Sequence, residues 1–284
     1  MKAWAWMRSN AVLFVGILGI FYLLAPIAII ALFSFNDPVG RYNFEWVGFT
    51  TQYWQHPFAI QELTDALWTS IKLAFLTAIG ATILGTLIAI ALVRYQFFGR
   101  RAANLLIVVP MATPEVVIGA ALLSMFLVYG AKLGFGTLLI AHIMFSISFV
   151  VIVVRSRLIG FDRSLEEASA DLGASPLGTF WRITLPLLAP AVGSAAMLSF
   201  ALSIDDFVIS NFNSGSTVTF PLYIFGANQR GIPVQVNVIA TMLFTITVIA
   251  MIAVILQQRR AEKIAGMKPD EVANKKTVSL PGEG

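Results

Sequence analysis

The sequence contains no cysteine and few charged residues. Only 12% of its 284 residues are Asp, Glu, Lys or Arg, against roughly 25% in soluble domains. The absence of cysteine excludes a disulfide framework, a thiolate metal site and a cysteine nucleophile. Its two histidines, His56 and His142, fall in a polar segment and in an apolar run, so they are not expected to share a metal. We therefore expect no metal or other cofactor on this chain.

The sequence also lacks the P-loop pattern Gly-x4-Gly-Lys-Ser/Thr. In that loop, backbone N–H groups cradle the nucleotide phosphates and the lysine binds them. A chain without it is not expected to bind ATP in this way, so we expect no ATPase activity from it. If ATP drives its function, ATP and Mg²⁺ must be bound by a partner subunit.

What the chain has in abundance is apolar sequence. Hydrophobic residues make up 58% of it and the mean hydropathy is +0.82, which is typical of an integral membrane protein. Each long apolar run is sufficient to cross a ~30 Å hydrocarbon core as a helix. The first run is too long for the core of a signal peptide. We predict an all-α membrane domain over 11–256 with six spans, at 11–33, 67–93, 105–129, 137–154, 187–210 and 236–256.

The basic residues indicate how these spans are oriented. With six spans, 15 of the 19 Lys and Arg residues fall on one side, in 1–10, 94–104, 155–186 and 257–284. Positive charge accumulates in cytoplasmic segments, so we predict that both termini are cytoplasmic. This topology also accounts for the net charge of +4 without a nucleic-acid partner. The polar tail 257–284 is expected to be disordered.

The cytoplasmic loop 155–186 has the pattern of two short helices. Glu167–Leu172 is a run of good helix formers that Gly173 interrupts. Ser175 and Pro176 then provide a helix cap and a proline at the first helical position. We expect the second helix to end at Pro186, because proline cannot donate the helical hydrogen bond. Its aromatic residues, Phe180 and Trp181, either pack against the inner ends of the spans or insert into a groove on a partner.

The spacing Glu-Ala-Ser, three residues, Gly, nine residues, Ile, one residue, Leu-Pro in this loop resembles the EAA loop of permease subunits of ABC importers. Ser169 stands where that family usually has alanine, a change of small volume. The resemblance implies that the loop couples the permease to an ATP-binding subunit. The residues expected to do so are Glu167, Ala168, Gly173, Ala174, Ser175, Phe180, Ile183, Leu185 and Pro186.

Three acidic residues lie within the predicted spans. Asp205 and Asp206 are adjacent near the outer end of the fifth span, and Glu115 follows Pro114 in the third, where two prolines predict a broken or kinked helix. A carboxylate in a membrane is costly unless it is paired or faces water. These acids therefore either line a pathway for a cation or cap a neighbouring broken helix, where an acid favours the helix N-terminus.

Two other interpretations of the polar residues in the spans are weaker. An intramembrane aspartyl protease needs two aspartates from different helices that face each other. Asp205 and Asp206 are neighbours, and their side chains would diverge by ~100° on a helix. His142, in the fourth span, is expected to be a packed polar residue that bonds across helices.

Beyond the loop, several segments resemble the permeases of spermidine/putrescine importers. They are Ser34–Asn36, the run Leu202–Ser210 with its paired aspartates, and Gly231–Pro233 followed by Val236-Asn237 and Ala240-Thr241. The resemblance implies a type I ABC importer permease (MetI-like) fold and a polyamine substrate. It also implies a second permease subunit, two ATP-binding subunits and a substrate-binding protein as partners, with the first span wrapping a partner. The location that it implies is a bacterial inner membrane. An importer for thiamine, ferric iron or a phosphonate, or a membrane protein without a transport role, stays an alternative.

Overall fold

The computed structural model describes residues 11–40, 42–249, 251–252 and 256. Within these residues the chain is helical, and the β-structure is limited to an isolated bridge between Asn36 and Phe49. The described residues form two compact units, which we call the terminal unit, from the described parts of Met1–Ala59 and Gly231–Gly284, and the central unit, Ile60–Arg230.

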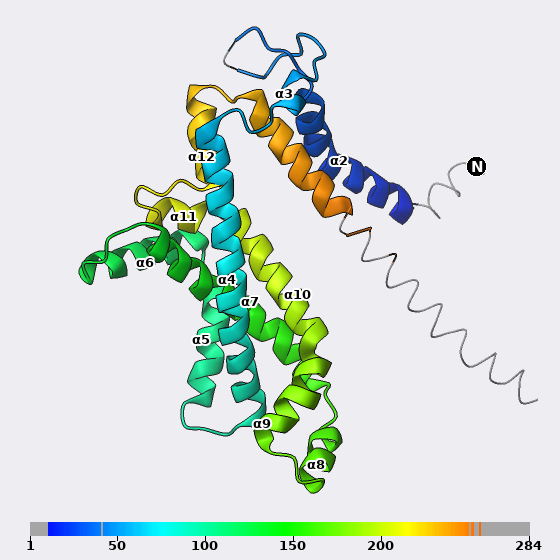
Figure 1. Cartoon of the computed structure of the whole chain (residues 1–284), viewed down its shortest axis with the longest axis vertical. Helices are drawn as coiled ribbons and strands as arrows, with labels where there is room; N and C mark the ends of the chain where they lie inside the picture. The colour runs from blue at the N-terminus through cyan, green and yellow to red at the C-terminus, as the bar shows by residue number, and fades with distance from the viewer. Residues whose placement is uncertain (1–10, 41, 250, 253–255, 257–284) are drawn as a thin grey trace, which may run out of the picture. The chain divides into compact units, whose positions relative to one another are not determined.

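Three long helices form the core of the central unit: α4 (Gln61–Arg94), α7 (Phe135–Ile159) and α10 (Leu185–Ile204) (Figure 1). Small residues allow α4 and α7 to approach closely, as in other membrane helix pairs. A Cβ added at Gly85 would lie 2.6 Å from Val150 Cγ1. The buried cluster at this contact consists of Ala81, Ala89, Leu92, Val150, Val151, Val154, Leu158, Leu188 and Ala195.

The third predicted span is broken, as its prolines indicated. Helices α5 (Arg100–Ala112) and α6 (Glu115–Val128) meet at an angle of 114°. Thr113, the residue before Pro114, has φ −90° and ψ 134°, because a following proline disfavours the helical conformation. The break therefore puts Glu115 at a helix N-terminus, and α6 packs against α11 and α7 around Leu122, Phe126, Ala141, Phe145 and Ile209.

The end of the fifth predicted span differs from the prediction. Helix α10 stops at Ile204, and a separate short helix α11 (Val208–Asn213) follows after a break. The next helix, α12 (Phe220–Arg230), packs on α4, where the Phe220 N–H donates to Ser70 Oγ at 2.8 Å. Asp205 and Asp206 thus lie in a junction between two helices rather than inside one helix.

In the terminal unit, α2 (Ala11–Phe33) has no buried residue. The loop that follows α2 is held by the hydrogen bonds of one asparagine. Asn36 is fully buried. Its amide donates to Asn43 Oδ1 and to the Glu45 carbonyl, both at 2.7 Å, and accepts from the Val47 N–H at 2.8 Å. The unit also contains the short helix α3 (Gln52–Gln55) and the apolar helix Val234–Ile249.

Four described helices are long and apolar enough to cross a membrane, and the α5–α6 pair makes a fifth if it is one span. The sixth predicted span, 236–256, corresponds to Val234–Ile249, which is shorter, and part of it lies outside the described residues. The count of six spans therefore stays a prediction. The segments 1–10 and 257–284 also lie outside the described residues.

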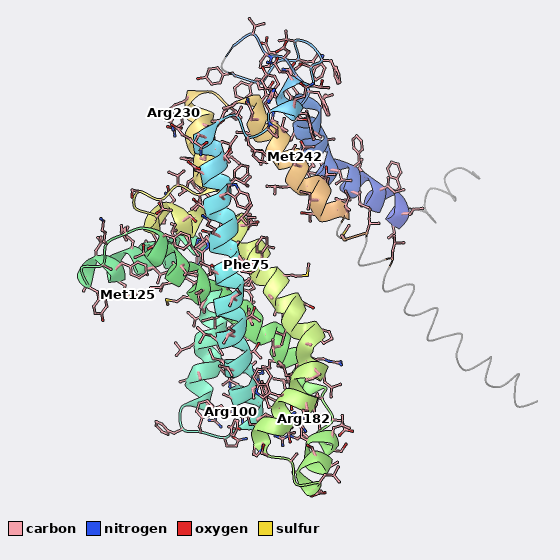
Figure 2. All side chains as sticks on the ribbon, in the orientation of Figure 1. Phe75, Arg100, Met125, Arg182, Arg230 and Met242 are labelled. Carbon is pink, nitrogen blue, oxygen red and sulfur yellow. The ribbon has the colours of Figure 1, made fainter. Side chains whose placement is uncertain are left out.

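The arginines of the central unit are separated as the predicted topology requires. Arg100 and Arg182, both predicted to be cytoplasmic, lie at one end of this unit, and Arg230, predicted to be external, lies at the other (Figure 2). The helices of the predicted coupling loop lie at the same end as Arg100 and Arg182 (Figure 1).

Candidate functional site

The predicted coupling loop forms two short helices joined at a glycine. Helix α8 spans Ser164–Asp171, three residues longer at its start than predicted. Asp162 accepts the Ser164 N–H at 2.9 Å, and the hydrogen bonds from Ser164 lower the pKa of this exposed carboxyl. Gly173 follows the helix with φ +81°, a conformation that costs little only for glycine. The chain therefore reverses direction at Gly173, as its position in the sequence predicted.

The second short helix begins as predicted but does not end as predicted. Ser175 caps α9 (Pro176–Thr179) by accepting the Gly178 N–H at 3.2 Å. The helix then widens into a π-helical turn, η1 (Phe180–Thr184), and continues directly into α10. The prediction that Pro186 ends the helix is wrong: Pro186 lies in the first turn of α10. The wider turn before it has the Leu185 N–H bonded to the Phe180 carbonyl, so the missing proline donor does not interrupt the run.

A hydroxyl pair holds the two short helices together. Ser169 Oγ and Thr179 Oγ1 are 3.0 Å apart, and both residues are buried. An alanine at position 169 could not make this bond. The serine at this position of the motif therefore fixes α8 against α9.

A second link joins the loop to the spans, and sequence reasoning missed it. Glu166 Oε1 lies 3.0 Å from Arg94 Nη2 at the end of α4 and accepts a hydrogen bond from Thr184 Oγ1 at 2.8 Å. The Arg94 guanidinium also lies 5.3 Å from the centre of the Phe161 ring, within the range of a cation–π contact. A single carboxylate thus connects α8 with α4 and with η1. Its partner Arg94 is 72 residues away, so no local spacing could have indicated the pair.

Large apolar side chains are exposed between the end of α8 and η1. Leu172 is 89% exposed, Leu177 69% and Trp181 60%. Phe180 is partly buried and packs edge to face on Trp181, with ring centroids 5.4 Å apart. The residues predicted to couple the permease to a partner also differ in exposure. Exposed are Glu167, Ala168, Gly173, Ala174, Ser175 and Pro186; partly buried are Phe180, Ile183 and Leu185.

The two adjacent aspartates have different surroundings. The Asp206 carboxylate is buried and accepts the N–H groups of Ile209 at 3.2 Å and Ser210 at 2.9 Å, which caps α11. Asp205 is exposed at the C-terminal end of α10. The predicted alternative that a carboxylate caps a broken helix therefore describes Asp206, and the cation-pathway alternative stays a prediction.

His142 connects this junction to α7. Its Nδ1 lies 2.7 Å from Ser203 Oγ, and its Nε2 lies 3.1 Å from Ser210 Oγ and 3.3 Å from Asp206 Oδ2. The prediction that His142 bonds across helices is confirmed. Glu115 is exposed at the start of α6. The three predicted pathway acids thus all lie at helix ends, Asp205 and Asp206 between α10 and α11 and Glu115 at the start of α6.

Comparison with known proteins finds likenesses to one family and to several of its relatives. The family model described as "binding-protein-dependent transport system inner membrane component" matches residues 81–263. The chain is 41% identical to the spermidine/putrescine transport system permease protein PotC of Haemophilus influenzae, over 84% of this chain and 91% of that protein. It is 35% identical to the putrescine transport system permease protein PotI of Escherichia coli, over 87% and 90% of the two chains.

Among solved structures, the chain is similar to one from a bacterial ABC transporter that imports the acidic polysaccharide alginate. The TM-score is 0.63 at 19% identity, and the match covers 89% of this chain and 96% of the other. At this identity the likeness concerns the fold alone. The fold is therefore the helical fold of an ABC importer permease, and the chain is a multi-pass membrane protein.

Proposed function

The chain belongs to the family of binding-protein-dependent transport system inner membrane components, and we propose that it is the permease subunit of an ATP-driven importer of polyamines. The observation that carries the proposal is the α8–α9 element. It has the EAA spacing, an exposed apolar surface, and fixed connections to two spans. A membrane protein without a transport role would not need an anchored element with exposed apolar side chains.

The anchoring explains how force from a partner reaches the spans. If an ATP-binding subunit holds α8 and α9, their displacement acts on α10 through the continuous helix after η1. It acts on α4 through the bond between Glu166 and Arg94. Since α4 and α10 are core helices of the central unit, movement of the loop tilts the core. ATP and Mg²⁺ belong to the partner in this mechanism, in which the permease opens alternately to each side.

A polyamine substrate is supported by the names of PotC and PotI and by the acids at the helix breaks. Spermidine and putrescine carry several ammonium groups at neutral pH, because aliphatic amines have pKa values near 10. Exposed carboxylates inside an otherwise apolar pathway would attract such cations. Asp205 and Glu115 are the exposed members of the group. We assign the substrate contact to them and a mainly structural role to Asp206.

The complete transporter in this proposal has a second permease subunit, two ATP-binding subunits and an external substrate-binding protein. The unburied α2 provides apolar surface for lipid and for the second permease. Both termini and the α8–α9 element lie in the cytoplasm, as the distribution of Lys and Arg indicates.

The test is reconstitution of the full complex in proteoliposomes with ATP on the motor side. Uptake of labelled putrescine and spermidine is measured with the binding protein, together with ATP hydrolysis. We expect both polyamines, or one of them, to enter and to stimulate hydrolysis. If a binding protein loaded with thiamine, ferric iron or a phosphonate stimulates ATP hydrolysis instead, the chain is still an importer permease, but its substrate is not a polyamine. ATP hydrolysis by the isolated chain would contradict the role as a whole.

A further inference from the structure

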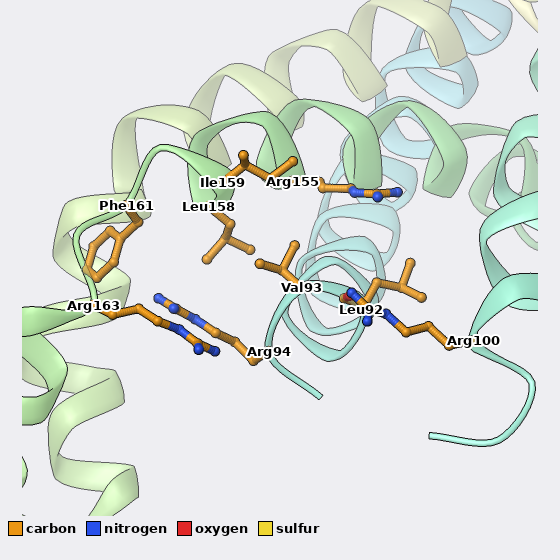
Figure 3. A pocket seen from close by; sticks show the side chains of 9 residues that line it. All are labelled: Leu92, Val93, Arg94, Arg100, Arg155, Leu158, Ile159, Phe161 and Arg163. Atoms are coloured by element: carbon orange, nitrogen blue, oxygen red, sulfur yellow. The ribbon is translucent and has the colours of Figure 1, made fainter. Parts of the chain in front are cut away.

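A pocket with a basic lining lies beside the α8–α9 element, at the end of the central unit that the charge distribution assigns to the cytoplasm. Its volume is about 310 Å³. Since a water molecule occupies about 30 Å³ of liquid, the pocket has room for on the order of ten water-sized groups. Four arginines and five apolar residues line it (Figure 3): Leu92, Val93, Arg94, Arg100, Arg155, Leu158, Ile159, Phe161 and Arg163.

The four arginines come from four different segments. Arg94 ends α4, Arg100 begins α5, Arg155 lies in the last turns of α7, and Arg163 precedes α8. In the view of Figure 3, the Arg94 and Arg163 side chains lie near Phe161, and the Arg100 and Arg155 guanidinium groups lie toward the other side. The convergence is thus a product of the tertiary structure and not of one basic stretch of sequence.

Within the described residues, hydrogen bonds hold three of these side chains, and an ion pair offsets the charge of only one. Arg100 Nε donates to the Leu92 carbonyl at 2.9 Å, and Arg155 Nη1 donates to Asn104 Oδ1 at 2.7 Å. Both acceptors are uncharged. Within the described residues, the one carboxylate that pairs with a lining arginine is Glu166, with Arg94, and the Arg163 side chain has no hydrogen bond or ion pair. The pocket therefore keeps an excess of positive charge.

An anion in the pocket would be favoured, because it would offset the repulsion between these like charges. Arginine forks match the geometry of phosphate oxygens and can bind them through two parallel hydrogen bonds. The apolar part of the lining, from Leu158, Ile159 and Phe161, adds a surface that a free inorganic ion would not use. A phosphate joined to a hydrocarbon group uses both parts.

We propose that this pocket binds a phosphate group at the cytoplasmic end of the spans, supplied by the headgroup of an anionic phospholipid. Basic pockets between spans on the cytoplasmic side are suited to such headgroups. The bound lipid would connect the ends of α4, α5 and α7 to the base of α8. It would therefore stabilise the frame from which the α8–α9 element projects.

The experiment compares two double variants of the full-length chain, purified in a neutral detergent. Arg100→Gln with Arg155→Gln removes two lining arginines. The matched control, Arg101→Gln with Arg157→Gln, removes two exposed arginines of the same helices that do not line the pocket. Both pairs change the net charge equally. Retained phosphatidylglycerol and phosphatidylcholine are measured by native mass spectrometry, and binding of inorganic phosphate by calorimetry.

We expect the unchanged chain and the control to retain phosphatidylglycerol over phosphatidylcholine, and the pocket variant to bind it roughly 10-fold more weakly. Phosphate binding that depends on the same arginines without any lipid preference would support the phosphate site and assign it to a soluble anion. Equal losses in the two double variants, or no loss in either, would overturn the proposal. If the pocket variant does not fold, Arg163→Gln replaces it, since this side chain is exposed and has no hydrogen bond or ion pair within the described residues. A loss of roughly threefold is then expected, and no loss would overturn the proposal.

Discussion

At the scale of single residues, the neighbours Asp205 and Asp206 have separable roles. Asp206 satisfies two backbone N–H groups of α11 in a buried junction, where an unpaired polar group is costly. Asp205 is exposed and caps nothing. Asp206 therefore stabilises the start of α11, and Asp205 is the acid that we propose to meet a cation.

This difference predicts opposite results for two substitutions. Asp205→Asn should lower polyamine uptake without changing the thermal stability of the chain, because only an exposed charge is lost. Asp206→Ala should lower the free energy of unfolding by roughly 1–3 kcal/mol, because two buried N–H groups lose their acceptor. Uptake in proteoliposomes and thermal unfolding in detergent measure the two effects. Normal uptake by the Asp205 variant would reject its place in the pathway.

Glu166 and Glu167 form a second pair of neighbours with different surroundings. Glu166 bonds Arg94 and Thr184, and Glu167 is exposed. Glu166→Gln should destabilise the isolated chain by about 1 kcal/mol, since the ion pair is partly buried. Glu167→Lys should leave the unfolding temperature unchanged and abolish substrate-stimulated ATP hydrolysis by the complex. Equal unfolding temperatures for the two variants would contradict the assignment of the anchor to Glu166.

At the scale of elements, the α8–α9 pair depends on one backbone conformation. Gly173 has φ +81° and no neighbouring atom within 4 Å of an added Cβ. A side chain there would meet no steric clash with other residues, so any effect must come from the backbone alone. The angle between α8 and α9 is therefore set by the joint, and the Ser169–Thr179 bond holds it.

Gly173→Ala should strain the joint by about 1–2 kcal/mol and reduce stimulated ATP hydrolysis, while the chain stays in the membrane. Gly193→Ala is the matched control. It is in α10, also has open space around an added Cβ, and has no positive φ, so it should leave coupling intact. ATPase rates with and without loaded binding protein measure coupling. Gly173→Asn should be milder than alanine, because asparagine tolerates this conformation better. Unchanged stimulation in both Gly173 variants would rule out a role for the joint.

At the scale of the whole molecule, membrane orientation is the property on which the function depends. The coupling element must be cytoplasmic to reach a nucleotide-driven partner. The loop after α2 must then be on the other side. The absence of cysteine makes this arrangement accessible to labelling at single introduced thiols.

Leu172→Cys, at the tip of α8, should be unreactive toward a membrane-impermeant maleimide in intact cells and reactive in inverted vesicles. Val39→Cys should behave in the opposite way. The two parent side chains are equally exposed in the isolated chain, at 89% and 90%, so the labelling is done in cells that lack the ATP-binding subunits, where a difference reports membrane side and not accessibility. Labelling of Leu172→Cys from outside would reject the orientation and with it the coupling role.

The sequence by itself determined the features that depend on local chemistry. Apolar length identified the chain as a multi-pass membrane protein, Pro114 identified the break between α5 and α6, and Gly173 with Ser175 identified the joint and the second helix. Each of these follows from the backbone preferences of a few adjacent residues. The same reasoning failed at Pro186, because a π-helical turn precedes this proline and the helix continues through it. No property of proline alone predicts such a turn.

Only the tertiary structure decided which distant groups meet. Glu166 reaches Arg94 across 72 residues, and His142 lies against Asp206. The four pocket arginines also come from separate segments. Charges and hydrogen-bonding groups act over a few ångströms in space, whereas sequence patterns report neighbours only along the chain. For this reason the class of the protein was readable from its residues, and the anchor of its coupling element and its basic pocket were not.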